Sequence, residues 1–114
     1  ILVNEGSASA SEILAGALRD QRGISLVGAR TFRKGSIQRL EELHNGSSLK
    51  LTTAKWVLPS GTILEGEGLL PDVEVAITED DRKEERDPQL EKALEILKEK
   101  IGAQEGGQLY IIGF

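Results

Sequence analysis

The chain has 114 residues and a formal net charge of −5, with 14 Lys and Arg against 19 Asp and Glu. It is therefore sized for one domain with a modest core, and its charge disfavours nucleic acid or an anionic membrane as the main partner. The absence of cysteine excludes disulfides, thiolate zinc sites and cysteine nucleophiles, and no apolar run approaches the roughly 18 residues that a membrane span needs. The sequence starts at Ile1 rather than Met and shows no signal peptide, which is compatible with an excised or processed chain that lacks its targeting segment.

The first thirty residues predict a strand, a helix and a second strand. Ile1–Val3 is a short apolar run that ends in a polar, glycine-containing turn, as expected of a buried strand. Ser9 and Glu12 have the spacing of a capping box, which predicts a helix that runs to a stop at Gly23. The apolar stretch 24–29 predicts the second strand. In such a βαβ-like unit, the turn before the helix lies at the carboxyl end of a strand, where open α/β sheets hold ligands.

The middle of the chain predicts a β-hairpin and one further strand. Ser36–Leu43 and Ser48–Leu58 are strand-like segments, and the Asn45-Gly46 pair between them is a strong hairpin signal. Val73–Ile77 predicts the last strand, after a loop rich in glycine and proline.

The composition then changes. Thr78–Asp87 is charged and has no apolar residue, so we expect a solvated linker. Pro88 follows Asp87 as a candidate first helical residue after its cap, and an apolar stripe continues to Gly102. Gln104–Gly107 predicts a flexible joint, and Gln108–Phe114 a β-prone apolar tail.

The serine-rich turn before the first helix offers a nucleophile. Small residues allow the backbone to turn tightly there, and the start of a helix presents free N–H groups. The hydroxyl of Ser9 could attack a carbonyl while neighbouring N–H groups receive the developing oxyanion. From the residues alone, a simple N-cap role for Ser9 is the more common alternative.

Two residues could serve as the base for such a serine. His44 is the only histidine, but it lies in the predicted hairpin turn, where a solvated surface residue is the usual outcome. Lys34 follows the second strand at the same end of the sheet as Ser9, and a lysine amine acts as a base where desolvation or nearby positive charge keeps it neutral. The residues alone do not exclude that Lys34 is simply one solvated lysine among many.

A family resemblance bears on this choice. The sequence resembles the carboxyl-terminal processing peptidases, also called tail-specific proteases, from residue 1 to about residue 97. The similar blocks, in order, are Val3–Ile13, Thr31–Gln38, Gly46–Ala54, Leu58–Gly61, Gly68–Val73 and Asp87–Leu94.

The resemblance implies a Ser/Lys dyad. The nucleophile of the family falls on Ser9, its general base on Lys34, and the polar residue that positions this lysine on Gln38. The backbone N–H of Ala10 becomes the expected oxyanion donor. The implied chemistry is acyl transfer by Ser9 followed by hydrolysis, and it requires neither a metal nor a cofactor.

The implied protein is a serine endopeptidase that cleaves protein or peptide substrates with apolar C-termini, in the periplasm, cell envelope or thylakoid lumen. The implied fold is α/β, a fragment of a crotonase/ClpP-like protease core. We expect residues 1–79 to form the C-terminal part of this core, 80–102 the charged linker and amphipathic helix, and 103–114 the joint and tail. The PDZ domain and upstream core strands of the family, with the second oxyanion donor, are absent from the sequence.

One residue departs from the family pattern. Arg33 stands where the family commonly has glycine, and a positive φ there would cost about 1 kcal/mol in strain. Its charge beside Lys34 would favour a neutral amine. Because the upstream parts are missing, the alternative to an active peptidase is a non-catalytic fragment or interaction module. A relative of the acyl-CoA crotonases is disfavoured, since Ser9, Lys34 and Gln38 together match the protease pattern.

Overall fold

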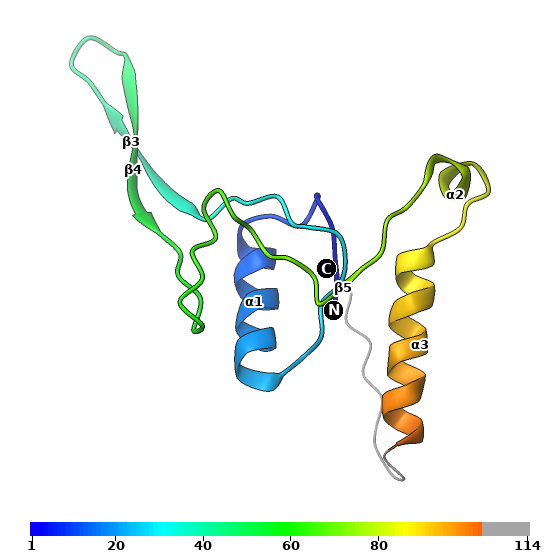
Figure 1. The fold of residues 1–114 in the computed structure, drawn as a ribbon. Helices are drawn as coiled ribbons and strands as arrows, with labels where there is room; N and C mark the ends of the chain where they lie inside the picture. Colours follow the sequence, from blue (N-terminus) through cyan, green and yellow to red (C-terminus); the bar gives the residue numbers. More distant parts are fainter. Residues whose placement is uncertain (104–114) are drawn as a thin grey trace.

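The computed structural model describes residues 1–103 and shows a small three-stranded sheet between two helices (Figure 1). The sheet consists of β1 (Leu2–Val3), β2 (Val27–Gly28) and β5 (Val73–Glu74), in the order β1-β2-β5 with parallel neighbours. The register places Leu2 opposite Val27. The predicted mixed α/β class is therefore confirmed.

Helix α1 (Ala10–Arg22) connects β1 to β2 and completes the predicted βαβ-like unit. It ends as predicted at Gly23, which has a φ of +63° and donates its N–H to the carbonyl of Arg19 at 2.9 Å. One face of α1 packs on the sheet and on the loops after β4. The buried core consists of Val3, Ala15, Leu26, Leu58, Leu64 and Leu69.

Strands β2 and β5 are shorter than the sequence predicted. The segment 24–29 forms only two ladder residues, because the N–H of Leu26 bonds to the carboxylate of Asp72 at 2.7 Å rather than to a strand. The predicted strand Val73–Ile77 likewise ends at Glu74. The sheet that carries the site is thus a short platform.

Helix α3 (Pro88–Gly102) contacts β1 and β2 from the side of the sheet opposite α1 (Figure 1). As predicted, Pro88 is its first residue and Asp87 its cap, with the Asp87 carboxylate accepting the Leu90 N–H at 2.9 Å. The buried side chain of Gln89 donates to the carbonyl of Val75 at 2.8 Å, which fixes the start of α3 to the end of the sheet.

The prediction of a plain linker at Thr78–Asp87 is wrong in part, because a one-turn helix, α2 (Glu79–Lys83), forms within it. The Thr78 hydroxyl accepts the Asp81 N–H at 3.1 Å, and the Asp81 carboxylate accepts the Thr78 N–H at 2.9 Å. This capping box stabilises a helical turn without burial, so a purely charged composition did not reveal it.

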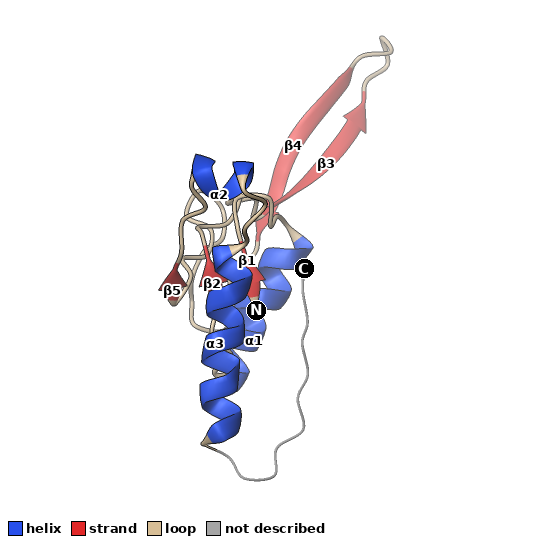
Figure 2. Cartoon of the chain, turned by 90° about the vertical axis from the view of Figure 1, so that its right-hand side faces the viewer, coloured by secondary structure: helices blue, strands red, loops and turns tan. Residues whose placement is uncertain are grey.

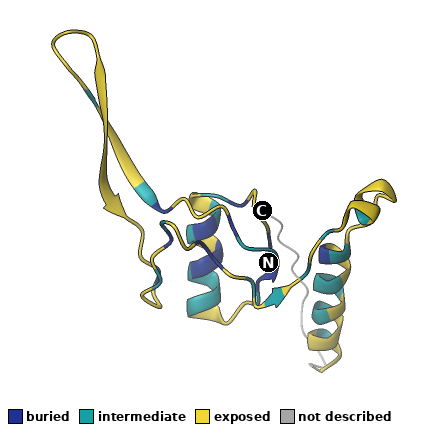
Figure 3. Ribbon diagram, turned by 45° about the horizontal axis from the view of Figure 1, so that its top comes forward, coloured by how far each residue is buried: buried dark blue, intermediate teal, exposed yellow. Residues whose placement is uncertain are grey.

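Strands β3 (Ser36–Glu42) and β4 (Ser48–Lys55) form the predicted antiparallel hairpin, and Gly46 in its turn has a φ of +79°. The hairpin projects away from the sheet and helices (Figure 2). Nearly all of its residues are exposed (Figure 3).

The predicted joint at residues 104–107 and tail at residues 108–114 lie outside the described residues. Within residues 1–103, no helix has the length and apolar character needed to cross a membrane.

The carboxylate of Asp20 makes stability depend on acid pH. It accepts the Ser60 N–H at 2.9 Å and joins α1 to the turn after β4. Hydrogen bonding from Ser60, together with the Arg19 guanidinium, lowers the pKa of Asp20 from its ordinary value of 3.8. The contribution of this group to the free energy of unfolding is therefore complete above about pH 4 and is lost as the pH falls through the lower folded-state pKa.

The substitution Asp20→Asn tests this role. We expect the urea concentration at the midpoint of unfolding to fall less between pH 7 and pH 3 in the variant than in the unchanged chain, and an equal fall in both would contradict this role.

Candidate active site

Ser9 stands at the junction of the turn and α1, in a strained conformation. Its φ is +55°, which few residues other than glycine adopt and which costs about 1–2 kcal/mol. Ser9 is exposed, and it forms a capping box with Glu12, whose side chain accepts the Ser9 N–H at 3.0 Å. Ser9 is therefore the N-cap of α1, as the sequence allowed, and backbone strain of this kind is also common at functional sites.

The turn that leads to Ser9 is held by Asn4 and Ser7. The Ser7 N–H bonds to the Asn4 carbonyl at 2.9 Å, and the Asn4 N–H bonds to the Ser7 hydroxyl at 3.1 Å. The Asn4 side chain also accepts the Gly6 N–H at 2.8 Å. We call residues 4–9 the nucleophile turn.

A single carboxylate joins this turn to the loop after β2. Glu12 is fully buried, and its Oε2 accepts the backbone N–H groups of both Ser9 and Lys34, each at 3.0 Å. Its Oε1 accepts the Arg33 N–H at 2.9 Å and the Thr31 hydroxyl. Four donors therefore converge on one side chain, and the backbones of the predicted nucleophile and base share one acceptor atom.

The loop that carries Lys34, residues 31–35, is also fixed from its other side. The Thr31 hydroxyl accepts the Leu69 N–H at 2.7 Å, and the Gly35 N–H bonds to the Glu65 carboxylate at 2.9 Å. The Phe32 N–H reaches back to the Ser7 carbonyl at 2.9 Å. We call this segment the lysine loop, and its backbone is held by hydrogen bonds on both sides.

Gly35 is at a position where a side chain cannot fit. A Cβ there would lie 2.4 Å from the Glu65 nitrogen and 2.5 Å from the Leu64 Cβ. The close approach of the two backbones therefore requires glycine directly after Lys34.

The structure brings the predicted site residues together only in part. Ser9 and Lys34 are close in backbone position, but both side chains are exposed, and in the described part of the chain no hydrogen bond joins them. Gln38 lies on β3, four residues beyond Lys34, and is exposed. Ala10 is the first residue of α1, so the helix itself supplies no acceptor for its N–H. His44 is exposed in the turn between β3 and β4, at the end of the hairpin that is far from the nucleophile turn.

The sequence did not reveal the full role of Glu12 and Thr31. Glu12 was assigned only to the capping box, and Thr31 was one residue of a motif. A glutamate on the same helical face as Ala15 and Gly16, which are both buried, was the available signal for a structural carboxylate.

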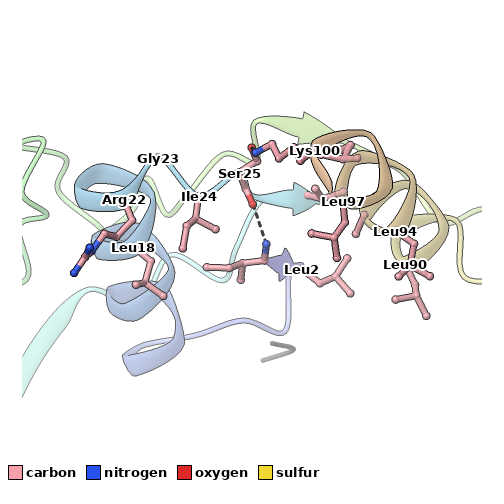
Figure 4. Close-up of a pocket in the computed structure, with 14 residues that line it drawn as sticks. Leu2, Leu18, Arg22, Gly23, Ile24, Ser25, Leu90, Leu94, Leu97 and Lys100 are labelled. Carbon is pink, nitrogen blue, oxygen red and sulfur yellow. Dashed lines mark hydrogen bonds between the residues drawn. The ribbon is translucent and has the colours of Figure 1, made fainter. Parts of the chain in front are cut away.

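A second feature, an apolar cavity of about 430 Å³, lies away from this site, between the end of α1 and α3 (Figure 4). Leu18, Ile24, Leu94 and Leu97 are among its lining residues, and neither Ser9 nor Lys34 is. Among residues 1–103, no group of His, Asp and Glu side chains is arranged to hold a metal ion.

Comparison with known sequences assigns the chain to a protein family. The profile of peptidase family S41 matches residues 1–75, and the chain belongs to this family.

Individual relatives are proteases. The chain is 49% identical over 76 residues to a probable CtpA-like serine protease of Staphylococcus haemolyticus, which covers 67% of this chain and 15% of that protein. It is 49% identical over 75 residues to a carboxy-terminal-processing protease of Bartonella bacilliformis, covering 66% of this chain and 17% of that protein. The chain thus spans about one sixth of the length of these relatives.

The fold also matches a solved structure. The photosystem II D1 C-terminal processing protease aligns with a TM-score of 0.58 and 46% identity, over 65% of this chain and 19% of that chain. The predicted family resemblance is therefore confirmed.

Replacing Glu12 should loosen the lysine loop. Glu12→Gln substitutes an NH₂ group for one acceptor oxygen and leaves buried donors without partners, which should cost about 2 kcal/mol or more in the free energy of unfolding. Urea denaturation measures this, and amide exchange should accelerate at residues 31–34. Glu5→Gln, at an exposed position in the nucleophile turn, is the control and should change neither quantity.

Arg33 has a φ of +75°, the positive value that the common glycine of the family at this position suggested. Arg33→Gly should therefore raise the free energy of unfolding, by about 0.5–1 kcal/mol after the entropy cost of glycine in the unfolded chain. Arg33→Ala removes the same charge but keeps a Cβ in the strained region, so it should give no such gain. Equal stability of the two variants in urea denaturation would show that the strain is not the cause.

Proposed function

We propose that the protein is a serine peptidase with Ser9 as nucleophile and Lys34 as general base. The observation that carries the proposal is the shared acceptor: one oxygen of Glu12 binds the backbone N–H groups of both residues. Two chain segments separated by a whole helix are thereby held in a fixed relation, which is what a two-residue catalytic site requires. Membership of peptidase family S41 and the names of the similar proteins support the same reaction class.

The proposed mechanism is acyl transfer. The neutral amine of Lys34 takes the proton of the Ser9 hydroxyl, whose oxygen attacks the carbonyl carbon of the scissile peptide bond. The Ala10 N–H donates to the developing oxyanion, and Gln38 orients the lysine amine. The protonated lysine then gives its proton to the leaving amine, and water attacks the acyl-enzyme with Lys34 again as base.

The exposure of both side chains indicates what the site still needs for turnover. A lysine acts as a base only as the neutral amine, which desolvation favours, so we propose that the exposed Lys34 side chain is covered in the reacting complex. A bound peptide lying over the nucleophile turn would supply part of that cover. The 75–76 matched residues make up only 15–17% of these relatives, which are therefore about four times as long as this chain, and segments of that kind are the natural source of the rest.

The finer proposals follow from the family resemblance. Substrates are proteins cleaved near an apolar C-terminus, and the location is extracytoplasmic. The core is of the crotonase/ClpP-like kind, with residues 1–79 as its C-terminal part and 80–102 as the connecting segment and helix. The similarity to a protease named for C-terminal processing of the photosystem II D1 protein supports the cleavage position.

The dyad is tested in the intact protein in which this chain occurs, with a fluorogenic peptide that ends in apolar residues. Ser9→Ala and Lys34→Ala should each lower kcat/KM by a factor of about 10³ or more, because neither half of a dyad works alone.

Ser11→Ala and Lys50→Ala are the matched controls, and they should retain the activity of the unchanged protein. Full cleavage by the Ser9 or Lys34 variant would refute the dyad. If the unchanged intact protein shows no turnover, the alternative of a non-catalytic interaction module replaces the proposal.

A further inference from the structure

Both outer edges of the hairpin are unpaired among residues 1–103. Within residues 1–103, β3 pairs with β4 alone, and the two strands make their main contacts with each other (Figure 1). An isolated two-stranded ribbon is marginally stable in water, and an open edge is a template for another strand. Leu40, in the middle of β3, is 62% exposed.

The two edges of the hairpin differ in how well they are protected. Ile37 pairs with Ala54 and Gln38 with Thr52, so Thr53 is an extra residue on β4 and forms a bulge there. Strand β4 also carries lysines but no acidic residue. Bulges and lysines are the usual means of blocking an edge, whereas β3 is regular and has charges of both signs.

The sequence of β3 is complementary to itself when two copies run antiparallel with Leu40 opposite Leu40. In that register, Arg39 of each copy lies opposite Glu41 of the other, and Gln38 lies opposite Glu42. The apolar residues Ile37 and Leu43, at the two ends, also lie opposite each other. Arg39 and Glu41 already form an ion pair within one strand, so both side chains lie on the same face of the ribbon.

Other registers do not share this complementarity. Moving the centre of pairing to residue 39 or 41 places like charges directly opposite each other, and a parallel in-register arrangement does the same at both positions. A shift of one residue sets Leu40 against Arg39 in one direction and against Glu41 in the other, so a charged side chain lies opposite an apolar one. A single antiparallel arrangement with a two-fold axis at Leu40 therefore satisfies every position.

We propose that the open edge of β3 is a self-association surface, on which a second copy of this chain adds its own β3 to form a four-stranded sheet. The occupant is a second copy rather than an unrelated protein because the charge pattern of β3 matches its own reverse. Such a contact is isologous, with the same residues on both sides. The contact also covers the exposed Leu40 in both copies, and it supports the hairpin, whose first strand carries Gln38 near its base.

The experiment uses the 114-residue chain in sedimentation equilibrium. An interface of one strand pair is small, so we expect dimers to form between about 10 and 500 μM protein. Arg39→Glu and Glu41→Arg each place like charges opposite each other twice per dimer and should raise the dimer dissociation constant about tenfold or more. Lys50→Glu makes the same charge change on β4 and should leave the constant within about twofold.

The decisive sample is an equimolar mixture of the Arg39→Glu and Glu41→Arg proteins. Each is expected to be monomeric alone, but in the mixture every opposed pair is again of opposite sign, so a heterodimer should form with an affinity near that of the unchanged chain. The double variant Arg39→Glu/Glu41→Arg should likewise dimerise as the unchanged chain does. Leu40→Lys, at an exposed position, should weaken the dimer without unfolding the monomer.

Three results would overturn the proposal. They are a chain that stays monomeric at 500 μM, single variants that dimerise as well as the unchanged chain, and a mixture of folded single variants that fails to associate. Circular dichroism of each protein establishes that it is folded. None of these measurements depends on peptidase activity, so the outcome is separate from that of the dyad test.

Discussion

The buried carboxylate of Glu12 is the interaction on which the candidate site depends. It accepts hydrogen bonds from four groups that belong to two segments on either side of α1. A buried carboxylate must be fully hydrogen-bonded to be tolerated, and the free N–H groups of two tight loops must find acceptors as well. The carboxylate supplies acceptors for these N–H groups, and the N–H groups supply donors for the carboxylate. The nucleophile turn and the lysine loop are therefore held by the same side chain.

Backbone strain at the site has the same origin. Ser9 and Arg33 both have a positive φ, and the N–H of each bonds to Glu12. The hydrogen bonds to a buried charged group are strong enough to offset about 1–2 kcal/mol of strain at each residue. Gly35 extends the same argument to the other side of the loop, where the backbone near Glu65 leaves no room for a Cβ. The position of Lys34 is thus determined by its neighbours, while its own side chain extends into solvent.

The rest of the chain divides into a packed body and a projecting arm. The βαβ-like unit and α3 enclose the short sheet, and the hairpin leaves that body directly after the lysine loop. Gln38 therefore lies at the base of the hairpin. A protein or chain segment that binds the hairpin there would also lie next to the lysine loop. The apolar cavity beside α3 is on a different part of the body, and neither Ser9 nor Lys34 lines it.

The sequence by itself determined the local elements: α1 between its capping box and Gly23, the hairpin around Asn45-Gly46, and the start of α3 at Pro88. These features rest on interactions between near neighbours, which a sequence displays directly. The resemblance to the carboxyl-terminal processing peptidases, rather than any local pattern, singled out Ser9, Lys34 and Gln38 as candidate site residues. Only the tertiary structure decided that Glu12 joins two distant loops and that β2 and β5 are two residues long. Hydrogen bonds between residues more than twenty positions apart depend on how the chain folds back on itself, and no local pattern encodes them.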